Sequence, residues 1–416
     1  MLSNTRRTLI LAGVTALAFA TYGFFNVNTG WETLSTSFMR NDRPYGGGDF
    51  RVKGNEVMSI KVAHPDVTFK PLSKLKDPQQ AEPTEAWMND TDELLNRTTV
   101  AFFRGTVDGG MKRYFQQFGQ GAAWWYTKDW RTQYVATAWI DYKAPTDEHD
   151  NAPKTTRLLK TSDGGKEWTQ LQWPAAQGIN QLLFLDAQRG YAVGERLGIW
   201  RTVDGGQSWH VVTPPAGAVT SARPNQQFNA VNLGPDGVLR VAYTVAQASS
   251  VQSFVERLDW GKEVFTRDAQ LPGQTIARLE ASPDSAADYS LYALALLDTT
   301  QSNGQDGQTR PKRERIGVIS TWTKTHPEAV TRLHTFDAGL MLDGLSVGTR
   351  GVLLVYATDP NTKNGGGAPI DLTFSSTDAG RNWTKTRDQT AQGGYFDPHD
   401  NTLYSLFAYT LKKQQF

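Results

Sequence analysis

No cysteine occurs among the 416 residues of this chain. Its absence excludes disulfide bonds, thiolate catalysis and cysteine-ligated metal sites together. An excess of either charge is also missing, because 43 lysines and arginines balance 42 aspartates and glutamates. A chain without a net basic field gives no reason to expect a nucleic-acid partner.

Short catalytic motifs are missing as well. The sequence contains no H-E-x-x-H zinc pattern, no G-x-S-x-G nucleophile turn and no P-loop spacing. We therefore predict no cofactor and no metal site, and we assign no catalytic residue.

One long uncharged run lies at the N-terminus. Arg6 and Arg7 precede residues 8–25, which would span about 27 Å as a helix. An Ala-x-Ala pattern at Ala18 and Ala20 favours a cleaved signal peptide, whereas the apolar residues that follow favour a retained anchor. In both alternatives the remaining chain is exported. We expect it on the periplasmic side of the inner membrane when anchored, and soluble in the periplasm or beyond after cleavage.

Glycine and tryptophan are abundant, with 38 and 13 residues, and suit many short strands joined by tight turns. One turn sequence is repeated, as TSDGGKEW at 161–168, TVDGGQSW at 202–209 and STDAGRNW at 376–383. A weaker copy begins at Thr106 and lacks the tryptophan. The repeated positions are Thr161, Asp163, Gly165 and Trp168; Thr202, Asp204, Gly206 and Trp209; Ser376, Asp378, Gly380 and Trp383; and Thr106, Asp108 and Gly110.

The spacing of the repeat indicates a structural turn. The aspartate can accept hydrogen bonds from backbone amides of its own turn, and the glycine can supply a positive φ. The tryptophan begins the return strand and can bury about 200 Å² between sheets. A calcium loop is the alternative, but one carboxylate per turn falls short of the six to eight oxygens that calcium binds.

These turns resemble the Asp-box, or bacterial neuraminidase repeat, of β-propellers. The resemblance implies an all-β propeller in which each box joins the third and fourth strands of a blade, away from the central pocket. Residues 182–212 also resemble a whole blade of the photosystem II assembly and stability factor group, which are exported propellers.

Strand-like runs between residues 122 and 388 divide into five blades of four strands. Two C-terminal runs, GGYFDP and TLYSLFAYTL, would share a sixth blade with TVAFFRGT and KRYFQQF near residue 100. This count predicts six blades closed by the two chain ends, or seven if SIKVAHP and VTFKPL build another. The predicted domains are 1–25 as signal or anchor, 26–97 as a linker with one short helix, and 98–416 as the propeller.

Three long connections between second and third strands should emerge on the face opposite the boxes, at 143–156, 298–315 and 358–369. Insertions gathered on one face are typical of a binding surface, and solvated loops are the alternative. The candidate binding residues on them are Asp147, Glu148, His149, Asp150, Arg310, Lys312, Arg313, Arg315, Asn361 and Lys363. We assign His399, in DPHDN, to a turn.

The Asp-box resemblance also raises sialidase activity, for which the family pattern needs a Phe/Tyr-Arg-Ile/Leu-Pro start. The nearest match, FFRG at 102–105, lacks the Ile/Leu-Pro pair. We therefore expect a non-catalytic, exported propeller with a protein partner. It would be an envelope-complex assembly factor or an inhibitor or immunity protein for a secreted protein. The alternative is a sialidase-like or other glycoside hydrolase, with a carbohydrate ligand.

Overall fold

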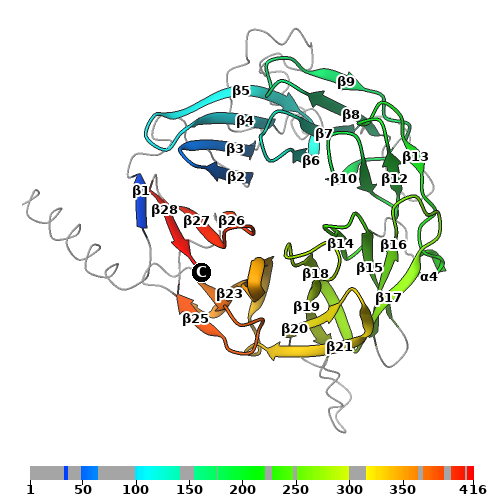
Figure 1. Ribbon diagram of the computed structural model, residues 1–416, viewed down its shortest axis with the longest axis vertical. Coiled ribbons are helices and arrows are strands. Elements are labelled where there is room, and N and C mark those ends of the chain that lie inside the picture. Colours follow the sequence, from blue (N-terminus) through cyan, green and yellow to red (C-terminus); the bar gives the residue numbers. More distant parts are fainter. Residues whose placement is uncertain are drawn as a thin grey trace, which may run out of the picture.

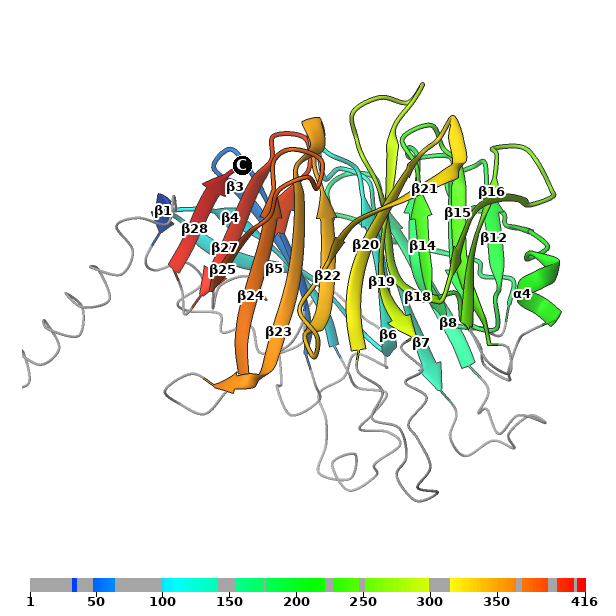
Figure 2. The same ribbon diagram turned by 90° about the horizontal axis from the view of Figure 1, so that it is seen from below.

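The computed structural model describes residues 32–35, 48–63, 99–140, 154–175, 177–220, 227–246, 251–298, 315–363, 369–387, 395–407 and 410–416. Within these residues, seven antiparallel sheets of four strands stand around a central axis, as a seven-bladed β-propeller (Figure 1). Seen from the side, the strands cross the thickness of the ring (Figure 2).

The blades are numbered along the chain, and the innermost strand of each is given first. Blades 1 to 3 consist of β2 (Gly48–Lys53), β3 (Glu56–Ala63), β4 (Thr99–Thr106) and β5 (Gly110–Phe118); β6 (Gln120–Tyr126), β7 (Gln133–Ile140), β8 (Lys154–Thr161) and β9 (Thr169–Leu171); and β10 (Ile179–Phe184), β11 (Gly190–Gly194), β12 (Ile199–Thr202) and β13 (His210–Val211). A short helix, α4 (Ala216–Thr220), follows blade 3.

Blades 4 to 6 consist of β14 (Ala230–Leu233), β15 (Leu239–Ala246), β16 (Val251–Leu258) and β17 (Thr266–Pro272); β18 (Gln274–Ala281), β19 (Ser290–Asp298), β20 (Arg315–Thr323) and β21 (His326–Thr335); and β22 (Met341–Val347), β23 (Leu353–Lys363), β24 (Pro369–Ser376) and β25 (Thr384–Arg387). A 3-10 turn, η2 (Thr349–Gly351), separates β22 from β23. Blade 7 consists of β26 (Tyr395–Asp397), β27 (Thr402–Phe407), β28 (Thr410–Gln415) and β1 (Glu32–Ser35).

Blade 7 closes the ring with both ends of the described chain. Its outermost strand β1 pairs with β28, with Glu32 opposite Lys413. Pairing across the ends removes an open sheet edge, a common site of aggregation.

The prediction of six blades is wrong, because the strands near residue 100 do not join the C-terminal strands. Instead β4 pairs with β3, with Thr99 opposite Ala63 at one end and Thr106 opposite Glu56 at the other. Blade 1 is therefore a separate sheet. The run SIKVA of the seven-blade alternative lies in β3, whereas VTFKPL lies outside the described residues. Three strands thus belong to the range 26–97 that the sequence analysis assigned to a linker.

Residues 8–25 and the predicted short helix near residue 90 also lie outside the described residues. Among the residues that the structure does describe, no helix is both long and apolar enough to cross a membrane.

The three full repeats form the same hydrogen-bonded turn between the third and fourth strands of blades 2, 3 and 6. In blade 3, the Thr202 hydroxyl donates to Asp204 Oδ1 at 2.8 Å and accepts from the Gly206 amide at 2.8 Å. Asp204 Oδ1 also accepts from the Ser208 amide at 2.9 Å. Gly206 has a φ of +85°, as the turn requires.

The tryptophan that ends each turn packs on the preceding blade. The ring centroid of Trp168 lies 4.0 Å from that of Phe115 in blade 1, and Trp209 lies 5.4 Å from Trp173 after β9. Trp383 lies 5.8 Å from Phe336, which follows blade 5. These contacts join adjacent blades.

We expect Asp204→Ala to lower the free energy of unfolding by about 1–3 kcal/mol, because it leaves turn donors without their acceptor. Asp204→Asn is the matched control, since it keeps an Oδ1 acceptor. Chemical denaturation of both variants measures the difference. Equal stability of the alanine variant and the wild type would contradict a structural role for the carboxylate.

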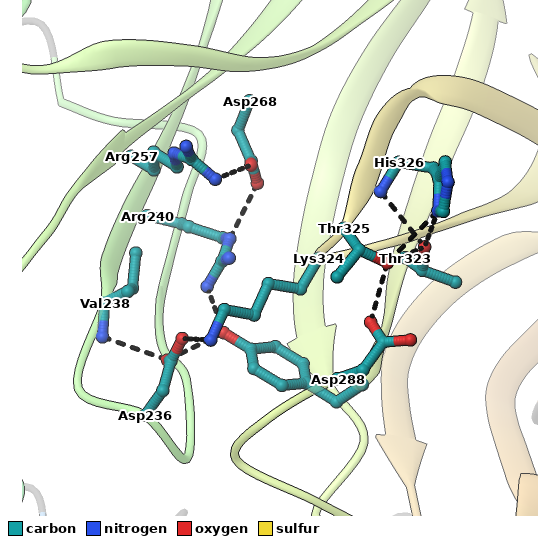
Figure 3. Close-up of polar contacts among 11 residues, drawn as sticks. Asp236, Val238, Arg240, Arg257, Asp268, Asp288, Thr323, Lys324, Thr325 and His326 are labelled. Carbon is teal, nitrogen blue, oxygen red and sulfur yellow. Dashed lines mark hydrogen bonds and ion pairs between the residues drawn. The ribbon is translucent and has the colours of Figure 1, made fainter.

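Blades 4 and 5 lack the repeated turn, and a buried polar network lies at their junction (Figure 3). Arg240 on β15 is fully buried; its Nε donates to Asp268 Oδ2 at 2.7 Å and its Nη1 to the Tyr289 hydroxyl at 2.6 Å. Tyr289 in turn donates to Asp236 Oδ1 at 2.8 Å, and Lys324 pairs with Asp236 at 2.8 Å. The network thus connects three strand-linking segments of the two blades.

Candidate binding channel

The axis of the propeller contains a channel with two lobes. The wide lobe has a volume of about 850 Å³ and is lined by blades 1, 2, 5, 6 and 7. The narrow lobe has a volume of about 590 Å³ and is lined by blades 2 to 5. Trp125 on β6 and Glu280 on β18 line both lobes and therefore stand where the lobes meet.

Aromatic side chains dominate one side of the wide lobe. Trp124, Trp125 and Tyr126 come from the end of β6, and Tyr395 comes from β26. The Arg51 guanidinium of β2 lies 4.0 Å from the Tyr395 ring centre and 5.6 Å from that of Tyr126. This cation–π arrangement spans from blade 7 to blade 2 and orients the guanidinium.

Charged turn residues surround the end of the wide lobe. Lys53, Lys128 and His399 are exposed and lie at the ends of first strands or in the turns that follow them, in blades 1, 2 and 7. Asp397 Oδ1 accepts from the His399 amide at 2.9 Å, and Asp400 Oδ1 accepts from the Thr402 amide at 3.0 Å. The lobe thus presents both signs of charge around an aromatic wall.

Among the described residues, Glu280 is the one acidic side chain that lines the narrow lobe. Its Oε2 accepts from Asn232 Nδ2 at 3.4 Å, across the junction of blades 4 and 5. Burial in the channel wall raises the pKa of Glu280 to about 7, and the nearby Arg278 charge opposes this rise. A carboxyl group whose pKa is shifted in this way inside a cavity is a candidate functional group.

Three of the candidate residues from the insertions are described, and each lies on a second or third strand of its blade. Arg315 begins β20, where its backbone pairs with Asp298, and Asn361 and Lys363 lie near the end of β23. The other seven lie outside the described residues: Asp147, Glu148, His149, Asp150, Arg310, Lys312 and Arg313. The turns that line the wide lobe connect first strands to second strands. Because neighbouring strands are antiparallel, the connections from second to third strands begin at the opposite end of the propeller.

Catalytic groupings are sparse in the described part of the chain. No group of three or more His, Asp or Glu side chains there is arranged to hold a metal ion. The FFRG match lies on β4, a third strand, where Arg104 Nη2 donates to the Trp130 carbonyl at 3.2 Å. That arginine belongs to the packing between blades 1 and 2.

No family model matches this chain, and no curated protein sequence matches it. Among solved structures it is similar to YCF48 bound to D1 peptide, with a TM-score of 0.51 and 11% identity over 94% of this chain and 96% of that chain. YCF48 from Cyanidioschyzon merolae gives a TM-score of 0.46 and 12% identity over 93% and 99%. The GH74 xyloglucanase from Xanthomonas campestris gives 0.43 and 16% over 75% of this chain and 49% of that chain.

Similarity at these identities shows the fold alone. The sheets and the channel define the chain as a seven-bladed β-propeller, an all-β architecture that it shares with YCF48.

Proposed function

We propose that this chain is a non-catalytic protein-binding propeller whose wide lobe receives an extended segment of its partner. The observation that carries the proposal is the concentration of tryptophan, tyrosine and arginine in one cavity. These residue types are enriched in the energetic centres of protein interfaces. The lobe's volume also lies in the range of natural ligand sites.

The surroundings of the lobe suit a polypeptide. Its wall offers aromatic faces for apolar side chains, and its turns offer both cations and carboxylates. A segment with mixed side chains can satisfy these groups simultaneously. The YCF48 structure contains a D1 peptide, and we extend peptide binding to this chain as a fold-level analogy.

The sequence supports the cellular setting of the proposal. The apolar run 8–25 behind Arg6 and Arg7 favours export, with the propeller anchored at the periplasmic side of the inner membrane or released there. The repeated turns, which we identify with Asp-boxes, hold blades together. The partner is then an envelope complex under assembly or a secreted protein that the propeller inhibits, and the insertions form a second contact surface.

Site-specific photocrosslinking of the full chain in cells tests which surface the partner contacts. A photoreactive amino acid replaces Lys53 or Lys128 at the wide lobe, Lys312 on an insertion, or Glu328 as an exposed control on β21. We expect Lys53 and Lys128 to yield an adduct with the same polypeptide, in the membrane or periplasmic fraction, and Glu328 to yield none.

Adducts from Lys312 alone would contradict binding at the wide lobe and would favour the opposite face. The same purified chain is tested on a panel of fluorogenic glycosides that includes sialosides. Turnover that a single carboxylate substitution abolishes would replace the binding proposal with the hydrolase alternative.

A further inference from the structure

Glu280 differs from the other acidic groups of the interior. Asp268, Glu256 and Asp236 are largely buried, and each has a lysine or arginine partner. Glu280 has no such ion pair among the residues that the structure describes, and its hydrogen bond from Asn232 is long, at 3.4 Å. A partly desolvated carboxylate without a cation is unfavourable, so a cation supplied from the channel would be bound strongly.

The surroundings of Glu280 define the cation that fits. Arg278, two residues earlier on β18, is exposed, and its guanidinium donates to the Ala277 and Asp343 carbonyls at 3.0 and 3.3 Å. Arg278 also lines the narrow lobe, but these two carbonyls hold its guanidinium and it forms no ion pair with Glu280, which lines both lobes. Trp125 supplies an indole that borders the same space.

The indole is held in place by its neighbours. Its centroid lies 5.0 Å from that of Phe184 and 6.0 Å from that of Tyr134. A carboxylate together with a fixed aromatic ring is the pair of groups that recognises an ammonium or guanidinium ion.

We propose that Glu280 and Trp125 form a site for one compact organic cation, a primary ammonium or guanidinium group, at the junction of the two lobes. The group belongs to a lysine or arginine side chain or to a free amine. This site goes beyond the proposed protein binding, because a free amine would occupy it without any protein partner.

Occupancy depends on pH, because only ionised Glu280 attracts the cation. With a pKa of about 7, its ionised fraction falls as the pH drops below 7. The apparent affinity should then fall about tenfold for each further pH unit. The other charged groups of the lobes are Arg278, Arg51, Lys53, Lys128, His399, Asp397 and Asp400. Of these, His399 is the histidine, and the variant His399→Gln separates its contribution from that of Glu280.

Isothermal titration calorimetry of the full chain at pH 8 tests the site. The probes are agmatine and n-butylamine, with 1-butanol as the uncharged control. Acetyl-Gly-Lys-Gly-amide and its norleucine analogue distinguish a side chain from a free amine. We expect both amines and the lysine peptide to bind, and Glu280→Gln to weaken their binding by about tenfold or more.

Two matched variants complete the design. Glu328→Gln, on an exposed outer strand, should bind like the wild type. Trp125→Phe should weaken amine binding while keeping an apolar ring. Equal binding of 1-butanol, or unchanged affinity in Glu280→Gln, would overturn the proposal. A pH dependence of binding that disappears in His399→Gln would also overturn it, because Glu280 is intact in that variant.

Discussion

Asp268→Asn should lower the free energy of unfolding by about 3–5 kcal/mol, because it leaves the Arg240 charge buried without its counter-ion. The side chains of both residues are fully inaccessible, and Arg240 Nε lies 2.7 Å from Asp268 Oδ2. Arg257 Nη1, at 3.8 Å from the other carboxylate oxygen, also loses its partner. Urea denaturation at neutral pH gives the stability difference.

Asp337→Asn is the control, since Asp337 also pairs with a cation, Lys385 at 2.9 Å, but both side chains are substantially exposed. Surface pairs of this kind contribute about 0–1 kcal/mol. The double variant Arg240→Met with Asp268→Leu should recover much of the stability lost in Asp268→Asn, because the fully buried Arg240 charge is removed together with its counter-ion. Similar losses from Asp268→Asn and Asp337→Asn would contradict the importance of burial.

The buried polar network around Arg240 lies at the junction of blades 4 and 5, and this location explains why both blades can lack the repeated turn. In blades 2, 3 and 6 the turn's tryptophan joins a blade to the one before it. At the junction of blades 4 and 5, Tyr289 and Lys324 of blade 5 reach Asp236 and Arg240 of blade 4. We infer that polar contacts there perform the joining role that aromatic packing performs elsewhere.

The local features were accessible to sequence reasoning, whereas the long-range pairings were not. The aspartate of each repeat bonds to groups within four residues, so its spacing alone describes the turn. The partner of β1 lies at the other end of the chain, at Lys413, and no local pattern identifies it. The strand β3 entered only the seven-blade alternative, because its partner strand β4 follows after a long intervening segment, with Thr99 opposite Ala63.

The channel was missed for the same physical reason. Its lining comes from the innermost strand of every blade, so residues distant in sequence meet only when the ring closes. Arg51 lay in a range assigned to a linker, and Glu280 stands in an ordinary alternating strand. His399 does occupy a turn, after β26, but that turn also lines the wide lobe. The three insertions were recognised by the length of their segments, and the length of a connection does not indicate where in the fold a cavity forms.

Gly165→Ala should lower the free energy of unfolding by about 3 kcal/mol, through backbone strain together with overpacking. Gly165 has a φ of +91°, and an added Cβ would lie 2.3 Å from Tyr114 Cε2 and 2.5 Å from its Cδ2. Tyr114 cannot easily move, because its hydroxyl donates to Gln133 Oε1 at 2.8 Å and its ring packs edge-on to Phe102. The second glycine of the turn is therefore required by the preceding blade as well as by its own backbone.

Gly261→Ala isolates the backbone contribution, since Gly261 has a φ of +81° and a Cβ there would meet nothing within 4 Å. It should cost about 1 kcal/mol. Gly206→Ala should fall between the two, because its Cβ would lie 2.9 Å from Leu171 Cδ1, the end of a side chain that can rotate. Thermal and urea denaturation of the three variants measure the order. If Gly165→Ala and Gly261→Ala lost equal stability, the contact between this turn and blade 1 would contribute nothing, and the turn would serve its own hairpin alone.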